Sequence, residues 1–360
     1  TGAAFWQALA NAVNNGSGPL RGPSRYFVAV PGPNGTLLPS VGMTLQASGG
    51  TDGAAGISSA MMVGVDSLPR SGMYALRGQG CSPALLADLD DWATWSAQAG
   101  FGLQEGCYMI LTGPAGDSIA NAVTQKAQAG LDSYAAKLMF GDWVWWQDTA
   151  NGVTRMVSPQ GFVAGRLANL SPEQSSLNKP LYGVIGTQRS GAPGSGQTTS
   201  YSAAELATLL TAGVDVISNP QPAGAFWGVR GGHNSSSNAG TNGDNYTRLT
   251  NYISTTLAAG MGQYVGEVIQ AGLFRRIRAT LLSFLQGMLG QGLLGSSDGQ
   301  LPFSVVCDVS NNPATRTALG YVQADVQVQY QAINEKFIVN VEGGQTVSVQ
   351  RQRLPYGQAA

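Results

Sequence analysis

Polar and apolar residues alternate most regularly between residues 301 and 344, near the C-terminal end of the chain. Three strands are predicted there, over residues 303–309, 321–330 and 337–341. In the second strand the even positions from 322 to 328 are apolar and the odd positions from 323 to 329 are polar. One face of the predicted sheet is therefore apolar, and that face needs a cover.

Two long apolar helices are predicted directly upstream, within residues 246–294, and can supply that cover. Their apolar residues follow helical spacing, and Gly272 is the predicted break between them. The apolar positions are Leu249, Ile253, Leu257, Met261, Val265 and Ile269 in the first helix, and Leu273, Ile277, Leu281, Phe284, Leu285 and Met288 in the second. A segment rich in Gly, Ser and Asn, residues 231–245, precedes them and predicts a domain boundary.

The middle of the chain has an α/β pattern. Buried strands are predicted over residues 107–112 and 138–146, and a helix over residues 119–129. A helix over residues 202–212 should begin with a capping box, because Glu205 follows Ser202 by three positions. Ser82 and Pro83 predict the start of one more helix. Its apolar side would consist of Leu85, Leu86, Leu89, Trp92 and Trp95.

The N-terminal part should contain a helix over residues 1–15 and a strand over residues 25–30. Phe5, Leu9 and Val13 form the apolar stripe of this helix, which should stop at the Asn-Asn-Gly sequence that begins at residue 14. The turn-rich residues 31–48 predict a β-rich connection.

Composition narrows the function classes. Only 11% of the residues are charged, against about 25% in an ordinary soluble domain. The formal net charge is −1, so nucleic acid is not an expected partner. No apolar run reaches the ~18 residues of a membrane-spanning helix. A surface so poor in charge suits a protein that is covered by neighbouring subunits.

The residues capable of chemistry do not indicate an enzyme. His233 is the only histidine, it lies in the Gly/Ser/Asn-rich segment, and no GxSxG motif supplies a serine for a triad. Asp90 and Asp91 are neighbours in a predicted helix and point in different directions, which disfavours a two-carboxylate site. Residues 49–53, Gly-Gly-Thr-Asp-Gly, match no phosphate-binding pattern. No catalytic residue, cofactor or metal site is predicted.

The three cysteines likewise indicate neither a disulfide framework nor a metal site. Cys81, Cys107 and Cys307 are far apart and form no CxxC motif. They are interpreted as buried free thiols of a reducing compartment rather than as a disulfide framework or zinc site.

Several motifs, in this order along the chain, resemble those of contractile tail sheath proteins, which build the contracting tube of myophages, R-type pyocins and related injection machines. The most specific is residues 157–165, which keep Pro159, Gly161, Ala164 and Gly165 of a family segment. Residues 225–230 keep a family motif with Trp227, Gly228 and Arg230. The remaining matches are residues 49–53, residues 72–76, and the C-terminal order of helix pair, Cys-Asp strand, short helix and two amphipathic strands.

This resemblance implies a fold class that is α/β and α+β. Residues 1–53 would form an N-terminal helix and β-rich connection, and the family's upstream arm is expected to be missing before residue 1. Residues 54–230 would form a central, subtilisin-like α/β domain without a triad. Residues 231–344 would form a C-terminal domain, with a helix pair on a small sheet completed by neighbouring subunits' arms, and residues 345–360 an extended arm.

The resemblance also implies a mechanical function. Such a chain would be a structural subunit that polymerises around an inner tube and contracts to drive it through the host envelope. The expected partners are copies of the same chain in stacked hexameric rings, the inner tail tube protein, and baseplate and tail terminator proteins. The expected location is a virion tail, assembled in the cytoplasm of the bacterial host.

Two groups of residues are predicted to make the contacts between subunits. The first would carry strand addition and the linking arm; its members are Tyr321, Gln323, Asp325, Phe337, Val339, Val341, Gln345, Thr346, Val347, Ser348 and Val349. The second is a basic cluster of Arg275, Arg276 and Arg278, which is expected to form ion pairs with another subunit or with the inner tube rather than to bind nucleic acid.

Two other classes remain open at this point. A surface-binding, adhesin-like module would use an aromatic cluster as a glycan platform. The members of this cluster are Phe140, Trp143, Trp145 and Trp146. A degenerate hydrolase would react with a serine-directed probe. Core packing with lateral contact is the favoured interpretation of the aromatic cluster.

Overall fold

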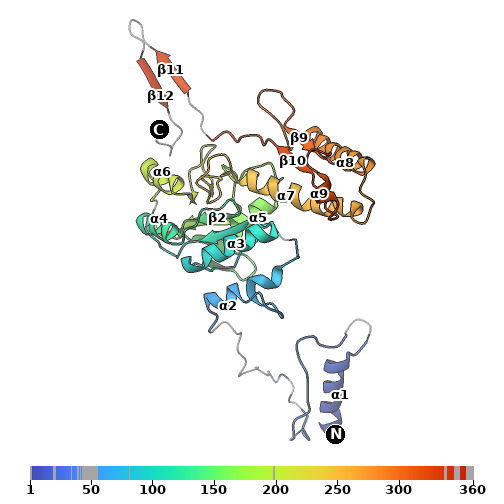
Figure 1. Ribbon diagram of the computed structural model, residues 1–360. Coiled ribbons are helices and arrows are strands. Elements are labelled where there is room, and N and C mark those ends of the chain that lie inside the picture. Colours follow the sequence, from blue (N-terminus) through green and yellow to red (C-terminus); the bar gives the residue numbers. More distant parts are fainter. Residues whose placement is uncertain are drawn as a thin grey trace. The chain divides into compact units, whose positions relative to one another are not determined.

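The computed structural model divides into two compact units, residues 1–56 and 57–360 (Figure 1). The structure describes residues 2–18, 22–33, 35–38, 40, 42, 56–80, 82–197, 199–335, 339–343 and 349–353.

The N-terminal unit contains the predicted helix, α1, over Gly2–Asn15. The predicted strand over residues 25–30 is wrong, since its described residues form no β-ladder. The amide of Asn14 instead accepts from the N–H of Ala29 and donates to its carbonyl, both at 2.8 Å. The apolar side chains of this segment stay exposed, with Tyr26 at 88% and Val28 at 84%.

A parallel sheet is the centre of the second unit. Its strands lie in the order β1 (Met109–Thr112), β2 (Ala136–Met139) and β6 (Val214–Asp215). The predicted strand over residues 138–146 is two strands, because the chain turns at Gly141, where a Cβ atom would meet the carbonyl oxygen of Pro114 at 1.9 Å.

Each face of this sheet carries its own apolar core. Even-numbered β2 residues such as Leu138 pack on one face against three helices. These are α3 (Trp95–Glu105), α4 (Ile119–Gln128) and α6 (Ala203–Thr211). The other face packs on α5 (Gln160–Ala168) and on a second, antiparallel sheet. That sheet has the order β4 (Val153–Val157), β3 (Val144–Asp148) and β5 (Val184–Thr187).

The predicted helix after Ser82 and Pro83 is wrong. Residues 82–91 form turns and a bridge from Ala84 to Met109, and the α-helix begins only at Trp95. Leu86, Leu89 and Trp95 are nevertheless buried. The apolar pattern therefore predicted these core positions correctly but predicted the wrong secondary structure. The shorter elements are α2 (Ser59–Val63), η1 (Gly72–Leu76), η2 (Trp92–Thr94), β7 (Ile217–Ser218) and β8 (Gly228–Val229).

The C-terminal part contains the predicted helix pair, α7 (Asp244–Met261) and α8 (Ala271–Gly290). The break lies at residues 262–270, not at Gly272, which is inside α8. Gly266 supplies a left-handed φ of 93° there. The remaining elements are η3 (Gly262–Tyr264), β9 (Phe303–Val306), α9 (Ala314–Thr317), β10 (Asp325–Val328), β11 (Val339–Gly343) and β12 (Val349–Arg353).

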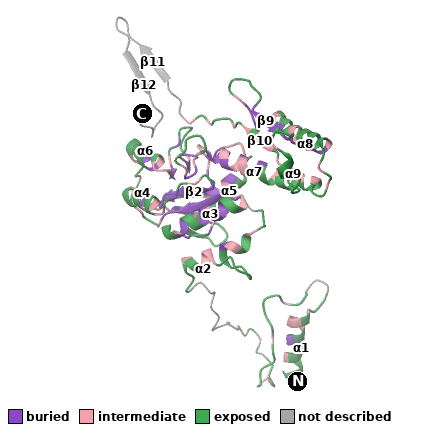
Figure 2. Ribbon diagram, in the orientation of Figure 1, coloured by how far each residue is buried: buried purple, intermediate pink, exposed green. Residues whose placement is uncertain are grey.

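The two helices pack on β9 and β10, as the sequence predicts. Leu273, Ile277 and Leu281 of α8 share a core with Phe303 and Val305 of β9. The third strand does not join that sheet, because β11 pairs with β12 in an antiparallel hairpin. Figure 2 shows buried residues gathered around β2 and along the inner sides of the helices. Among the described residues, no helix is long and apolar enough to cross a membrane.

Candidate functional site

Two strands of the parallel sheet each place one charged side chain on its β5- and α5-facing side. Strand alternation points Ala136 and Leu138 of β2 into the core with α3, so Lys137 points the opposite way. Val214 of β6 likewise faces that core, and Asp215 faces Lys137. Both charged residues are buried, with exposures of 0% and 2%.

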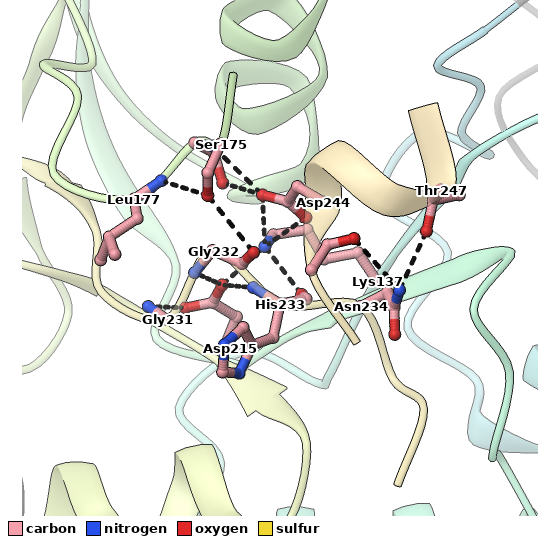
Figure 3. A network of polar contacts seen from close by, with 12 residues as sticks. Lys137, Ser175, Leu177, Asp215, Gly231, Gly232, His233, Asn234, Asp244 and Thr247 are labelled. Carbon is pink, nitrogen blue, oxygen red and sulfur yellow. Dashed lines mark hydrogen bonds and ion pairs between the residues drawn. The ribbon is translucent and has the colours of Figure 1, made fainter. Parts of the chain in front are cut away.

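Lys137 is the centre of a buried polar network (Figure 3). Its Nζ lies 2.6 Å from Oδ2 of Asp215 and 3.1 Å from Oδ1 of Asp244, the first residue of α7. It also donates to the carbonyl oxygen of His233 at 2.9 Å. We call Lys137, Asp215 and Asp244 the ionic junction. One ammonium with two carboxylates leaves a negative charge that other donors must compensate.

Main-chain N–H groups and hydroxyls provide that compensation. Asp215 accepts from the N–H groups of Gly231 and Gly232 at 2.7 and 2.8 Å. Asp244 accepts from the hydroxyls of Tyr108 and Ser176. The glycines allow the 231–233 backbone to turn around the carboxylate, and Gly232 has a left-handed φ of 67°.

The charges of Lys137 and Asp244 are stable around neutral pH. Burial favours neutral Lys137, but the charges of Asp215 and Asp244 outweigh it and raise the pKa of Lys137. Burial also opposes ionised Asp244, but the charge of Lys137 and the hydroxyls of Ser176 and Tyr108 lower the pKa of that carboxyl. Burial raises the pKa of Tyr108 well above its ordinary value, so this hydroxyl remains a donor.

Arg248 makes a second connection between α7 and the α/β core. Its guanidinium donates to the carbonyl oxygens of Leu167 and Leu170, at 2.7 and 2.5 Å, and to those of Ser171 and Gln174 at 2.9 and 3.1 Å. These carbonyls lie at and just beyond the C-terminal end of α5, where helix carbonyls lack intrahelical partners. The start of α7 is thus fixed to the core by both Asp244 and Arg248.

The two ends of the Gly/Ser/Asn-rich segment, residues 231–235 and 243–245, are part of the core, whereas residues 237–241 are exposed. Asn234 is 1% exposed, and its amide donates to Thr247 Oγ1 at 2.9 Å. Ser235 donates its N–H to the carbonyl of Ala136 at 2.7 Å and accepts from the N–H of Leu138. Composition suggests a domain boundary here, whereas Asn234 and Ser235 are buried hydrogen-bonding partners. The division proposed at residue 230 stays a prediction.

The structure does not assemble a triad around the histidine. His233 Nε2 lies 2.7 Å from Glu335 Oε1, and no serine hydrogen-bonds to the ring within the part of the chain that the structure describes. Within those same residues, no group of three His, Cys, Asp or Glu side chains is arranged to hold a metal ion. The network is built to hold charges in place.

The aromatic cluster is largely packed. Phe140 is buried, and the indole N–H of Trp143 donates to the carbonyl of Gly113 at 3.1 Å. Trp145 and Trp146 are half-buried in β3. This arrangement matches the interpretation of the cluster as core rather than as an open platform.

Tyr321, Gln323 and Asp325 lie together beside the β9–β10 sheet. Tyr321 is 64% exposed and lines a groove of about 680 Å³ with residues of α7 and α8. Gln323 uses its main chain within its own chain, since its N–H donates to Asn312 Oδ1 at 2.6 Å. Asp325 pairs with Val306 across the sheet. The part these three residues would play in strand addition stays a prediction.

The remaining predicted contact residues are elsewhere. Val339 and Val341 belong to β11 and pair with Arg353 and Arg351 of β12, and Val349 pairs with Gly343. They therefore do not extend the β9–β10 sheet. Phe337, Gln345, Thr346, Val347 and Ser348 lie outside the described residues.

The basic cluster is exposed on α8, and one of its three arginines is already paired. Arg276 forms an ion pair with Glu267 of the same chain. For Arg275 and Arg278 the structure shows no ion pair within 4.0 Å among the described residues.

Of the cysteines, Cys307 is a buried free thiol and Cys107 is buried, while Cys81 lies outside the described residues.

Solved structures share this fold. A chain of the anti-feeding prophage baseplate matches over 71% of this chain and 64% of its own length, with 14% identity and a TM-score of 0.56. The contracted sheath complex of the extracellular contractile injection system PVC matches over 67% of this chain and 64% of its own, with 16% identity and a TM-score of 0.54. The contracted helical sheath of the anti-feeding prophage covers 72% and 69%, with 16% identity and a TM-score of 0.55.

The chain thus spans about two thirds of the length of these solved chains, 64% of each of the first two. No protein-family model and no curated protein matches the sequence. At 14–16% identity the likeness establishes the fold, which is the sheath fold that the sequence resemblance predicted.

Proposed function

We propose that this chain is a structural subunit of a contractile sheath, joined to its neighbours by the addition of strands to the β9–β10 sheet. One observation carries the proposal: a two-stranded sheet whose β10 edge opens onto an apolar groove. Two strands alone are marginal in water, and an edge of this kind is a template for another strand.

Hydrogen bonding defines which main-chain groups are available. The N–H of Gln329 donates to the carbonyl of Pro302 at 2.7 Å, so odd-numbered residues of β10 direct their main-chain groups toward β9. By alternation, Val326 and Val328 direct their N–H and C=O groups toward the other edge. An added strand would pair with those groups.

The groove supplies apolar surface for the side chains of that strand. It is lined by Leu257 and Met261 of α7, by Ile277 of α8, and by Val322 and Val326 beside the edge. Main-chain pairing would provide affinity, and these apolar contacts would favour a strand with alternating side chains. Neither the main-chain pairing nor the apolar contacts require a charged partner, which suits a chain with 11% charged residues.

The proposed donor is the C-terminal arm, residues 345–360, of a neighbouring copy. A second possible donor is the segment around Val28, whose apolar side chains are exposed. Asn14 occupies the main-chain groups of Ala29, so added pairing would have to use those of Val28 and Val30. Removing each segment separately distinguishes the two.

The ionic junction supports the mechanical part of the proposal. A subunit that moves as a rigid body during contraction needs a stiff connection between its α/β core and its sheet. Asp244 and Arg248 provide such a connection through α7. In this proposal, copies of the chain form stacked rings around an inner tube, between a baseplate and a terminator, and act by movement rather than by catalysis.

Negative-stain electron microscopy of the purified chain tests the proposal. Rings or tubes are expected at high protein concentration. A chain that remains a dispersed monomer under all assembly conditions, and binds a glycan array instead, would favour the adhesin-like alternative.

A further inference from the structure

Residues 329–335, which we call the linker, connect β10 to the residues that precede β11. Three contacts hold the linker along the start of α7 and the α/β core. The ring of Tyr330 stacks on Tyr246 at a centroid distance of 5.8 Å, and its hydroxyl lies 2.9 Å from Thr250 Oγ1. Asn245 donates to the carbonyl of Gln331 at 3.1 Å. The last contact joins Glu335 to His233.

The contact at Glu335 differs from the other two because it can titrate near neutral pH. His233 is the only histidine of the chain, and its side chain is 21% exposed. A Tyr–Thr hydrogen bond and an amide–carbonyl hydrogen bond do not change between pH 5 and 9, whereas an imidazole does. The linker therefore has two constant contacts and one variable contact.

Charged groups surround this imidazole on several sides. Glu335 faces it from the linker. Asp215 of β6 accepts the main-chain N–H of His233 at 3.4 Å, and Lys137 of β2 donates to its carbonyl. Asp244 of α7 shares that lysine, and Arg230 lines a cavity of about 400 Å³ with Glu335. Glu335 contacts the ring itself, whereas Asp215 and Lys137 act on it through their charges alone.

The balance of these groups favours the charged ring. Burial of the imidazole favours its neutral form, but the hydrogen bond and charge of Glu335, together with the charge of Asp215, outweigh burial and the opposing charge of Lys137. The pKa of His233 is therefore raised above its ordinary value of about 6.5.

We propose that the ion pair between His233 and Glu335 is a pH-dependent latch that docks the linker on the α/β core. With His233 protonated, the linker is held at both of its ends. With His233 neutral, the linker keeps its contacts at Tyr330 and Gln331 and is released at Glu335.

The direction of the effect follows from the raised pKa. A group with a raised pKa in the folded state stabilises the docked form fully below its unfolded pKa of about 6.5, and this stabilisation is lost as the pH rises through the folded pKa. Docking is therefore strongest in mildly acidic solution and weakens from neutral into alkaline solution. This proposal concerns one chain and does not rest on the proposed assembly.

Because His233 is the only histidine, its ring resonances in a ¹³C-histidine-labelled chain report its titration without ambiguity. The wild-type ring should titrate above the ordinary value. Glu335→Gln should shift the titration downward, and Tyr330→Phe, which removes a constant contact of the linker, should leave it unchanged. Equal titration in wild type and Glu335→Gln would overturn the latch.

Trypsin cleavage after Lys336 gives a second readout. At each pH the cleavage rate of the wild type is divided by that of His233→Gln. This division removes the pH dependence of the protease itself. The ratio should be several-fold below one at pH 6 and should approach one at pH 9. A ratio independent of pH would show that the ion pair does not hold the linker, even if the ring titrates as expected.

Discussion

Lys137 on β2 and Asp244 on α7 are 107 positions apart in the chain, and their side chains meet in an ion pair with no solvent exposure. Asp215 completes the junction from the neighbouring strand. Breaking a contact of this kind strongly lowers the free energy of unfolding, because removing one partner leaves the others buried and uncompensated. This property gives the first prediction.

Lys137→Met should lower the free energy of unfolding by about 3–5 kcal/mol, because two buried carboxylates lose their cation. Urea denaturation followed by circular dichroism measures the change. Arg316→Met removes an exposed cation and should change stability by about 0–1 kcal/mol. Equal effects of the two substitutions would show that the junction does not contribute to stability.

The contribution of Asp244 to stability should be insensitive to pH across the neutral range. The lowered pKa of Asp244 means that its contribution is present above its unfolded pKa of about 3.9 and is lost as the pH falls through the still lower folded value. Thermal melts of wild type and Asp244→Asn should differ by a constant amount from about pH 5 to pH 9. The difference should shrink below about pH 4, and a difference that changes near pH 7 would contradict this assignment.

Deleting residues 344–360 should abolish ring or tube formation and leave a folded monomer, because the proposed donor strand is removed while all three apolar cores remain. Analytical ultracentrifugation and negative-stain microscopy measure the outcome. Deleting residues 1–38 is the matched comparison, because it removes the other possible donor. If only the second deletion prevents assembly, the segment around Val28 is the donor.

Arg275→Glu combined with Arg278→Glu should weaken assembly without altering the melting temperature. Both side chains are exposed, so their reversal acts on a partner rather than on the fold. Arg276→Gln should have a smaller effect, since Arg276 already pairs with Glu267. The difference should decrease in 0.5 M salt. Unchanged assembly after the double reversal would rule out the predicted ion pairs.

Local chemistry predicted the helices best. The capping box of α6 forms as expected, with Ser202 and Glu205 each satisfying the other's main-chain group. The helix predicted after Ser82 was wrong because closely spaced apolar residues also arise from buried turns beneath a sheet. Leu86 and Leu89 are buried without belonging to a helix, so burial and secondary structure have to be inferred separately.

The ionic junction was not predicted, although a signal was available. Lys137 and Asp215 are single charges within apolar strand sequences, a pattern that indicates buried, paired charges. The sequence alone does not say which anion meets which cation, because the partners are 78 and 107 positions apart. Composition also made residues 231–245 resemble a domain boundary, since buried and exposed Ser and Asn look alike in a sequence until their partners are known.

Helix α7 runs for 18 residues without a break from the junction to Met261, the last of its residues that line the groove. At ~1.5 Å per residue this is a rigid rod of about 27 Å. A tilt of about 5° at its anchored end would displace the far end by about 2 Å, by simple geometry on that length. Such a displacement is close to half the ~4.8 Å spacing between paired strands. How precisely the groove is positioned therefore depends on how tightly Asp244 and Arg248 hold the first turns of α7, about 27 Å away.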